Sequence, residues 1–287
     1  MKISDYQVFS ALDGTFLLDG GSMFGIVPRP LWARHHPPDE RGRIVMALRC
    51  LLLVGERRHI LIDAGLGERF AGKSQDIYCY RASGGGLVPN LARLGLRPED
   101  ITDVIASHLH FDHVGGLLST GPDGALRPVF PRARLHVQRD AWEWARNPSL
   151  WDEASFFQGD LDVWERAMDL SLLSGDAEIA PGVRVRANTG HTPGHQVVII
   201  GEGSSTLVFC ADLIPTATHL RLPYIMAYDQ RPLQTLEEKE LLLAQALEED
   251  WMLTFEHDPF VAACRLREKD GRAVAGDGVC LNRPAPR

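Results

Sequence analysis

The chain is poor in cysteine and in basic residues, and it contains no long hydrophobic run. Its five cysteines are scattered through 287 residues without a CxxC pair, so free, reduced thiols are expected. The 30 lysines and arginines are outnumbered by 38 aspartates and glutamates, and the net charge of −8 argues against a surface that binds nucleic acid. No apolar stretch approaches the length that spans a membrane, so no membrane partner is expected.

The composition, 45% hydrophobic and 24% charged, is typical of a globular protein that can bury a sizeable core. We expect one domain over residues 1–287, with the tail from about 272 to 287 partly disordered. Residues 1–6 contain no apolar segment after their basic residue, so no secretion signal is indicated and a cytoplasmic protein is expected. The sequence leaves the oligomeric state open, and a homodimer is compatible with it.

The most informative stretch is Ser-His-Leu-His-Phe-Asp-His-Val-Gly-Gly at 107–116, which places three imidazoles and a carboxylate within six positions. Side chains alternate in an extended segment, so His108 and His110 project the same way and can bind one ion together. If the chain bends after them, Asp112 and His113 can hold a second ion. Imidazoles combined with a carboxylate favour Zn²⁺, with Fe, Mn or Co as alternatives, over the oxygen-only sites of Mg²⁺ and Ca²⁺.

Three further metal-ligand types each follow a strand-like apolar stretch and precede a turn. They are His191 in Gly-His-Thr-Pro-Gly-His, Asp212 in Phe-Cys-Ala-Asp, and His257 in Phe-Glu-His-Asp. Functional side chains are often displayed at such positions on a rigid scaffold. The residues complete two sets with one shared ligand and a shared water: His108, His110 and His191 for one ion, Asp112, His113 and His257 for the other, and Asp212 for both.

In their order and spacing, HLHFDH, GHTPGH, the Asp of FCAD and the His of FEHD resemble the metallo-β-lactamase superfamily. The segments 19–32 and 225–229 are most similar to its quorum-quenching lactonase-like branch. The resemblance implies the metallo-β-lactamase fold, an α/β (α+β) sandwich of the αββα type with two mixed β-sheets between outer helices. It also implies two divalent metal ions as cofactors.

The pattern of apolar residues predicts the elements of such a sandwich. Strands are expected at 45–54, 58–62, 103–107, 134–137, 183–187, 196–200, 206–210 and 251–255. Helices are expected at 87–94, 139–145, 159–170 and 236–249. Thr235 and Glu238 have the spacing of a capping box for the last helix, whose apolar face would include Leu241 and Leu243.

Three positions differ from known members of the superfamily, and these differences bear on which reactions are expected. Asp212 stands where true β-lactamases of the superfamily usually carry Cys, so antibiotic hydrolysis is not expected. His110 stands where flavodiiron relatives carry Glu, which disfavours oxygen chemistry on iron. Known lactonases place a Tyr three residues after the bridging Asp, whereas this chain has Pro215.

Substrate-binding residues are expected among aromatic, Met and His side chains outside the metal motifs. A residue from the loop that follows Pro215 is expected to take the place of the missing Tyr, and other apolar side chains either line the pocket or belong to the core. The candidates are Met23, Phe24, Trp32, His219, Tyr224, Met226 and Tyr228. Asp63 and His195 are expected to support the ligands rather than bind metal, and His35 and His36 to mark an exposed loop.

The expected function is hydrolysis of a small-molecule ester or lactone, most simply an N-acyl-homoserine lactone. A water shared by two cations about 3.5–4 Å apart would ionise near neutral pH and attack the carbonyl, and Asp112 would pass a proton to the leaving group. The same site on a glutathione thioester or an organophosphate or aryl ester is the alternative. A non-catalytic metal staple is disfavoured because structural zinc sites are closed by four protein ligands.

Overall fold

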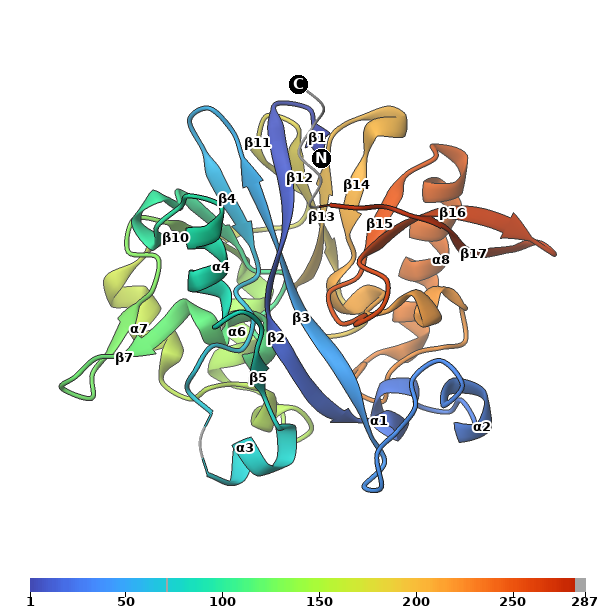
Figure 1. Ribbon diagram of the computed structural model, residues 1–287, viewed down its shortest axis with the longest axis horizontal. Helices are drawn as coiled ribbons and strands as arrows, with labels where there is room; N and C mark the ends of the chain where they lie inside the picture. The colour runs from blue at the N-terminus through green and yellow to red at the C-terminus, as the bar shows by residue number, and fades with distance from the viewer. Residues whose placement is uncertain (71, 282–287) are drawn as a thin grey trace.

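A computed structural model describes residues 1–70 and 72–281, and its first β-sheet is mixed (Figure 1). Its strands are antiparallel from β1 to β4 and parallel from β4 to β10. The order within the described residues is β1 (Lys2–Ile3), β2 (Tyr6–Asp19), β3 (Arg43–Val54), β4 (His59–Ile62), β6 (Asp103–Ile105), β9 (Arg134–Gln138) and β10 (Asp169–Leu173), with β5 (Arg81–Ala82) paired to β2.

The second sheet is also mixed, because its strands are antiparallel except for the parallel pair β14 and β15. Its order is β11 (Ala177–Ala180), β12 (Val183–Asn188), β13 (His195–Ile200), β14 (Leu207–Phe209), β15 (Met252–Thr254), β16 (Ala263–Lys269) and β17 (Arg272–Gly278). A separate hairpin joins β7 (Leu118–Thr120) to β8 (Leu126–Pro128).

Helices cover the outer side of each sheet (Figure 1). The first sheet is covered by α4 (Leu87–Arg93), α6 (Arg139–Arg146) and α7 (Asp160–Ala167), and the second by α8 (Pro232–Glu248). The short helices are α1 (Gly20–Phe24), α2 (Arg29–Trp32), α3 (Lys73–Tyr78) and α5 (Phe111–Val114).

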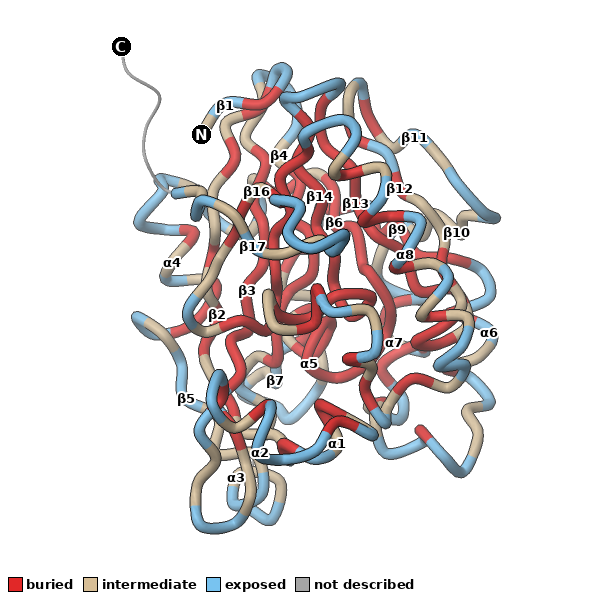
Figure 2. Tube along the Cα trace, turned by 90° about the vertical axis from the view of Figure 1, so that its right-hand side faces the viewer, coloured by how far each residue is buried: buried red, intermediate tan, exposed pale blue. Residues whose placement is uncertain are grey.

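The alternation of side chains along the strands explains this layering. In β13, Val198 and Ile200 belong to the hydrophobic cluster between the two sheets, whereas Val197 and Ile199 pack toward α8. Nearly continuous apolar strands are therefore buried on both faces, and the buried segments fill the middle of the molecule in Figure 2. The predicted αββα arrangement is confirmed.

The eight predicted strands are present, with ends shifted by no more than two residues. The four predicted helices are present too, but two details expected for α8 are wrong. Leu243 is buried as expected, but the helix begins at Pro232, so Thr235 lies inside it and cannot cap it. Leu241, expected on the apolar face, is 70% exposed, while Lys239 and Leu242 are buried.

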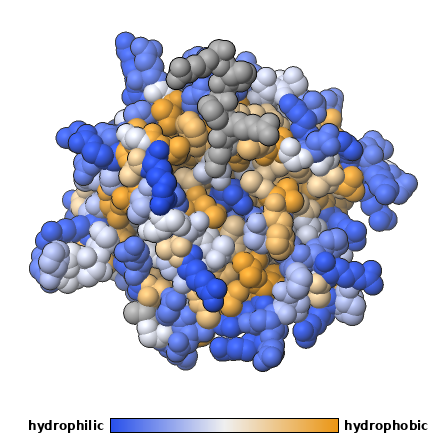
Figure 3. Space-filling view, viewed as in Figure 1, coloured by the Kyte–Doolittle hydropathy of each residue, from blue (hydrophilic) through white to orange (hydrophobic). Residues whose placement is uncertain are grey.

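The C-terminal segment also differs from expectation. The tail was expected to lose order from about 272, but Arg272–Gly278 forms β17 and pairs with β16. Residues 282–287 lie outside the described part. Within residues 1–70 and 72–281, no helix combines the length and apolar character that crossing a bilayer requires. Hydrophilic side chains form most of the outline of the face in Figure 3, with hydrophobic patches between them.

Candidate metal centre

The candidate metal centre lies where several strands of both sheets end. The loop after β6 carries His108 and His110, and α5 begins at Phe111, so the chain bends where the sequence predicted. The loop after β12 carries His191, and the segments after β14 and β15 carry Asp212 and His257. The earlier segment after β4 lies close to this loop, because a Cβ on Gly116 would collide with the carbonyl oxygen of Ala64.

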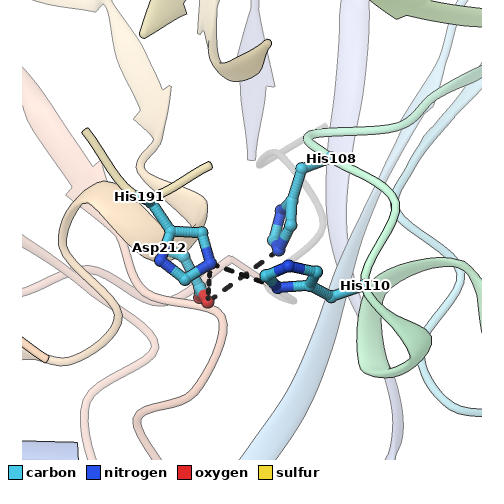
Figure 4. Close-up of side chains that lie close together, drawn as sticks. All are labelled: His108, His110, His191 and Asp212. Carbon is cyan, nitrogen blue, oxygen red and sulfur yellow. Dashed lines mark hydrogen bonds and ion pairs between the residues drawn. The ribbon is translucent and has the colours of Figure 1, made fainter. Parts of the chain in front are cut away.

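One group of buried ligand-type side chains consists of His108, His110, His191 and Asp212 (Figure 4). Asp212 Oδ2 lies 3.2 Å from His191 Nε2 and 4.0 Å from His108 Nε2. His110 Nδ1 lies 3.2 Å from His191 Nε2. Ligand atoms on a tetrahedral zinc ion are about 3.3 Å apart if each bond is about 2.0–2.1 Å long, so the group has the size of one coordination shell.

A second group consists of Asp112, His113 and His257. His257 Nε2 lies 3.3 Å from His113 Nε2 and 3.6 Å from Asp112 Oδ2. The other oxygen of Asp212, Oδ1, lies 3.1 Å from His257 Nε2 and 3.6 Å from His113 Nε2. Asp212 thus turns one carboxylate oxygen toward each group, which is the arrangement of a bridging ligand.

Hydrogen bonds on the far side of two rings fix which nitrogen faces the centre. His191 Nδ1 donates to Asp229 Oδ1 at 2.7 Å, and His257 Nδ1 donates to Ala47 O at 2.8 Å. Because each Nδ1 is committed to an acceptor, Nε2 is the nitrogen that faces inward and can bind a metal ion. Such partners orient metal-binding histidines and raise their basicity.

Two histidines of the HLHFDH motif, His108 and His113, also have protein partners at the ring nitrogen Nδ1. Ser107 Oγ donates to Asp63 Oδ2 at 2.6 Å and is therefore left to accept from His108 Nδ1 at 3.1 Å. His113 Nδ1 lies 3.0 Å from Asp63 Oδ2. The supporting role predicted for Asp63 agrees with these contacts, and His195 agrees as well, because its Nε2 accepts from the backbone N–H of Asp212 at 3.2 Å.

The centre fits a pair of cations. His108 Nε2 and Asp212 Oδ1 are buried without a hydrogen-bond partner, and the inward nitrogens of four histidines face one another. Lone pairs gathered in this way repel unless a positive charge lies between them. Imidazole nitrogens and carboxylate oxygens are the donors that zinc and related divalent ions bind.

Charge and burial shift the pKa values of the histidines in different directions, because carboxylates lie closer to some rings than to others. Burial, reinforced by the neighbouring imidazoles, lowers the pKa of His108 and of His110 well below the usual range, so both are neutral as metal binding requires. Burial also opposes a proton on His257, but the surrounding carboxylates, Asp212 foremost, together outweigh it and raise the pKa of His257 to about 9. A site that attracts a proton this strongly also attracts a divalent cation.

Three residues that support the centre were missed by sequence reasoning. Asp229 binds His191, and Glu256 Oε2 lies 2.9 Å from His113 Nδ1. Arg49 is buried and donates to the carbonyls of Phe255 and Asp258, on either side of His257. Glu256 adjoins His257 in the sequence, but the position of a partner 38 residues from His191, like Asp229, could not be read from local pattern.

Several residues proposed for substrate binding lie in a packed core instead. Met23, Phe24 and Trp32 are at most 3% exposed, and Phe24 stacks on Trp32 and on His219. Both ring nitrogens of His219 are used within the protein, one by Thr216 Oγ1 at 2.7 Å and one by the carbonyl of Met23 at 2.8 Å. These contacts leave His219 no free nitrogen for a substrate.

His36, expected on an exposed loop, is 3% exposed and contacts Thr218 Oγ1 at 3.1 Å.

Among the other candidates for substrate binding, Tyr224 and Met226 are buried, and Tyr228 is partly buried. Burial raises the pKa of Tyr228 to about 12 and raises that of Tyr78, and the charge of Asp112 acts on both phenols. Sequence reasoning did not name Tyr78, which the charge of Asp112 affects as it affects Tyr228.

The buried His219 predicts acid sensitivity. Burial lowers the pKa of His219 from 6.5 to about 3. Between these values the unfolded chain binds a proton that the folded protein does not, so the free energy of unfolding falls as the pH drops, by up to about 1.4 kcal/mol per pH unit. Urea unfolding of metal-free protein between about pH 4 and 7 should show a smaller slope for His219→Asn than for the wild type. Equal slopes would contradict this assignment.

Comparison with known proteins gives the family. Residues 47–257 match the metallo-beta-lactamase superfamily. An N-acyl homoserine lactonase from Bacillus cereus is 30% identical over 169 residues, which cover 55% of this chain and 60% of that protein. The chain thus matches little more than half the length of this curated relative.

Solved structures agree with the fold. A probable metal-dependent hydrolase from Staphylococcus aureus superposes with a TM-score of 0.85 at 28% identity, covering 98% of this chain and 100% of the other. A dizinc quorum-quenching lactonase in complex with a product has a TM-score of 0.77 at 20% identity, with 98% and 97% covered. The match over residues 47–257, joined to the αββα sandwich and its two ligand groups, shows that the chain belongs to the metallo-beta-lactamase superfamily.

Proposed function

We propose that the chain is a dinuclear metal hydrolase that opens the ring of N-acyl-homoserine lactones or closely related lactones. The observation that carries the proposal is the placement of Asp212, whose two oxygens face two separate groups of histidines. When bound, two divalent ions, most simply zinc, supply Lewis acidity toward a carbonyl oxygen and a water that ionises near neutral pH.

The ligand roles follow the two groups. We assign His108, His110 and His191 to one ion, Asp112, His113 and His257 to the other, and Asp212 to both. The His residues bind through the nitrogens that face the centre, and their outer nitrogens stay fixed by protein acceptors where the structure supplies them. The chain thereby holds the site rigidly before any substrate arrives, which is what positioning catalysis requires.

Asp112 has the more exposed side chain of the two carboxylates in the centre, at 11% against 8% for Asp212. The side chains of His113 and His257 are at most 1% exposed. A carboxylate at this place can hold a proton that leaves the attacking water and deliver it to the departing alkoxide. The partial exposure also separates this centre from a sealed structural zinc site, which supports catalysis over a metal staple.

An aromatic wall beside Asp112 suits an acyl group. Phe111 immediately precedes Asp112, and its ring lies 5.2 Å from those of Phe70 and Tyr78, measured between centroids. Phe157 completes the cluster at 5.6 Å from Phe70. The similarity to N-acyl homoserine lactonases from Bacillus species supports this substrate class.

A glutathione thioester would need cationic side chains for its carboxylates, and the sequence offers Arg41, Arg43, Arg57 and Arg58 for this role. Two of these four are already engaged within the protein. Arg43 is engaged by Asp39 at 2.8 Å, and Arg58 contacts Asp103 and the carbonyl of Ile179. Neither guanidinium is therefore free for the carboxylates of a tripeptide. The aryl ester and phosphotriester alternatives remain for experiment to decide.

A substrate panel tests the proposal. Purified protein with counted metal is offered homoserine lactones of several acyl lengths, lactoylglutathione, an aryl phosphotriester and an aryl ester. We expect turnover of the lactones to exceed that of the other substrates and to be lost after chelation of the metal. Efficient turnover of another substrate, with the lactones left intact, would overturn the proposal.

A further inference from the structure

Glu238, near the middle of α8, holds the loop that carries His191. Its carboxylate accepts the backbone N–H of Thr189 at 2.9 Å and that of Gly190 at 3.1 Å, one on each oxygen. These two N–H groups directly precede His191 in the chain. A two-oxygen contact fixes both the position and the tilt of the peptide that enters the ligand.

Lys239, the next residue, holds a second loop. It is 1% exposed, and its ammonium donates to the carbonyls of Tyr224 at 2.7 Å, Arg221 at 3.0 Å and Leu222 at 3.4 Å. Lysine is seldom buried this deeply, because removing its charge from water is costly unless the lost hydrogen bonds are replaced. Here the replacements are main-chain oxygens of a single turn.

The two loops also contact each other at His191. The backbone N–H of Gln230 donates to the carbonyl of His191 at 3.1 Å, and that of Arg231 donates to the carbonyl of Gly190 at 2.9 Å. Asp229 lies on the second loop and binds the outer nitrogen of His191 at 2.7 Å. The direction of the His191 imidazole therefore depends on where both loops lie.

We propose that Glu238 and Lys239 are positioning residues that clamp these two loops and so aim the His191 imidazole at its metal ion. The clamp is defined as the Glu238 carboxylate on residues 189–190 and the Lys239 ammonium on residues 221–224. The inference rests on the proposed function only in taking His191 as a metal ligand. Neither clamp residue touches the metal or the substrate.

The packing of α8 alone does not account for this pair. Leu242, Leu243 and Ala246 already supply the apolar contact between α8 and the second sheet. A Leu or Met at 239 would serve that purpose without burying a charge. The polar pair instead contacts the loop that carries His191 and the loop that leads to Asp229. The clamp therefore predicts an effect on the one ion that His191 binds.

Metal titration of the full-length protein tests the clamp without any substrate. Chelated, dialysed protein is titrated with Zn²⁺ against a chromophoric competitor, and the variants are Glu238→Gln, Lys239→Met and Asp229→Asn. Glu237→Gln is the matched control, because Glu237 is an exposed neighbour on the same helix. We expect the first three changes to weaken one of the two ions about 10- to 100-fold and to leave the other and the control unchanged.

A double-mutant cycle separates positioning from general destabilisation. If Glu238 acts through the Asp229–His191 pair, Glu238→Gln and Asp229→Asn together weaken the ion by less than the product of their single effects. Amide exchange within residues 188–194 should also be faster in metal-free Glu238→Gln than in Glu237→Gln. If Lys239→Met does not fold, Glu238→Gln carries the test.

Three outcomes would overturn the clamp. They are an equal loss of affinity for both ions, wild-type metal affinity in Glu238→Gln, or effects of Glu238→Gln and Asp229→Asn on affinity that simply multiply.

Failure of the proposed function would give different results. A wild-type protein that binds no metal contradicts the metal centre itself, and a fully loaded wild type that leaves lactones intact contradicts the substrate while the clamp stands.

Discussion

Asp212→Asn is expected to lower kcat/KM for lactone hydrolysis by about 10³-fold, equivalent to several kcal/mol of transition-state stabilisation. The asparagine keeps the shape of the side chain but replaces one of two oxygens by an amide NH₂. That group would face one of the two histidine groups, His108 and His191 or His113 and His257, at a place where the metal ion needs a ligand atom with a free lone pair. Steady-state kinetics with the metal content measured in parallel checks the expectation.

The control for this change is Asp123→Asn. Asp123 is exposed, pairs with Arg127, and belongs to neither ligand group. We expect the control to keep wild-type activity and two bound ions, whereas Asp212→Asn binds fewer. An Asp212→Asn enzyme with two ions and wild-type turnover would show that the carboxylate does not bridge.

Asp112→Asn is expected to lower kcat by about 10²-fold or more while KM changes little. An asparagine oxygen can still approach the ion, but the amide cannot take a proton from the attacking water and return it to the leaving alkoxide. Assays are therefore run at saturating metal, so that weaker binding at the group of His113 and His257 does not produce the loss by itself.

The role of Asp112 is tested most clearly by comparing two substrates whose leaving groups differ in their need for a proton. If Asp112 delivers the proton, the loss should be large for an alkyl lactone and smaller for an aryl ester, whose phenolate leaves without one. Equal losses on both substrates would assign Asp112 to metal binding alone, and an unchanged kcat would remove it from the reaction.

The ligand set could be predicted because its signals are local. His108, His110, Asp112 and His113 fall within six residues, and their placement depends only on an extended loop followed by one turn of helix. The strands that deliver the remaining ligands are apolar runs bounded by turns, and those runs were recognisable with small errors at their ends.

Other features depend on contacts between distant parts of the chain. The spacing of Glu238 to Thr235 indicates a capping box, but Pro232, three residues before Thr235, starts the helix earlier. The Glu238 carboxylate instead contacts the loop of His191. His219 reads as a free polar group, yet its two nitrogens are claimed by Thr216 and Met23. A sequence shows which side chains can form hydrogen bonds, and only the fold shows with which partners.

The most direct measurement is a crystal structure of the protein grown with zinc, with anomalous scattering recorded at the zinc edge. The proposed centre predicts two anomalous peaks about 3.5–4 Å apart, one within bonding distance of each oxygen of Asp212. A single peak, or peaks that leave Asp212 or His257 outside the coordination shell, would contradict the dinuclear centre on which the proposed hydrolysis depends.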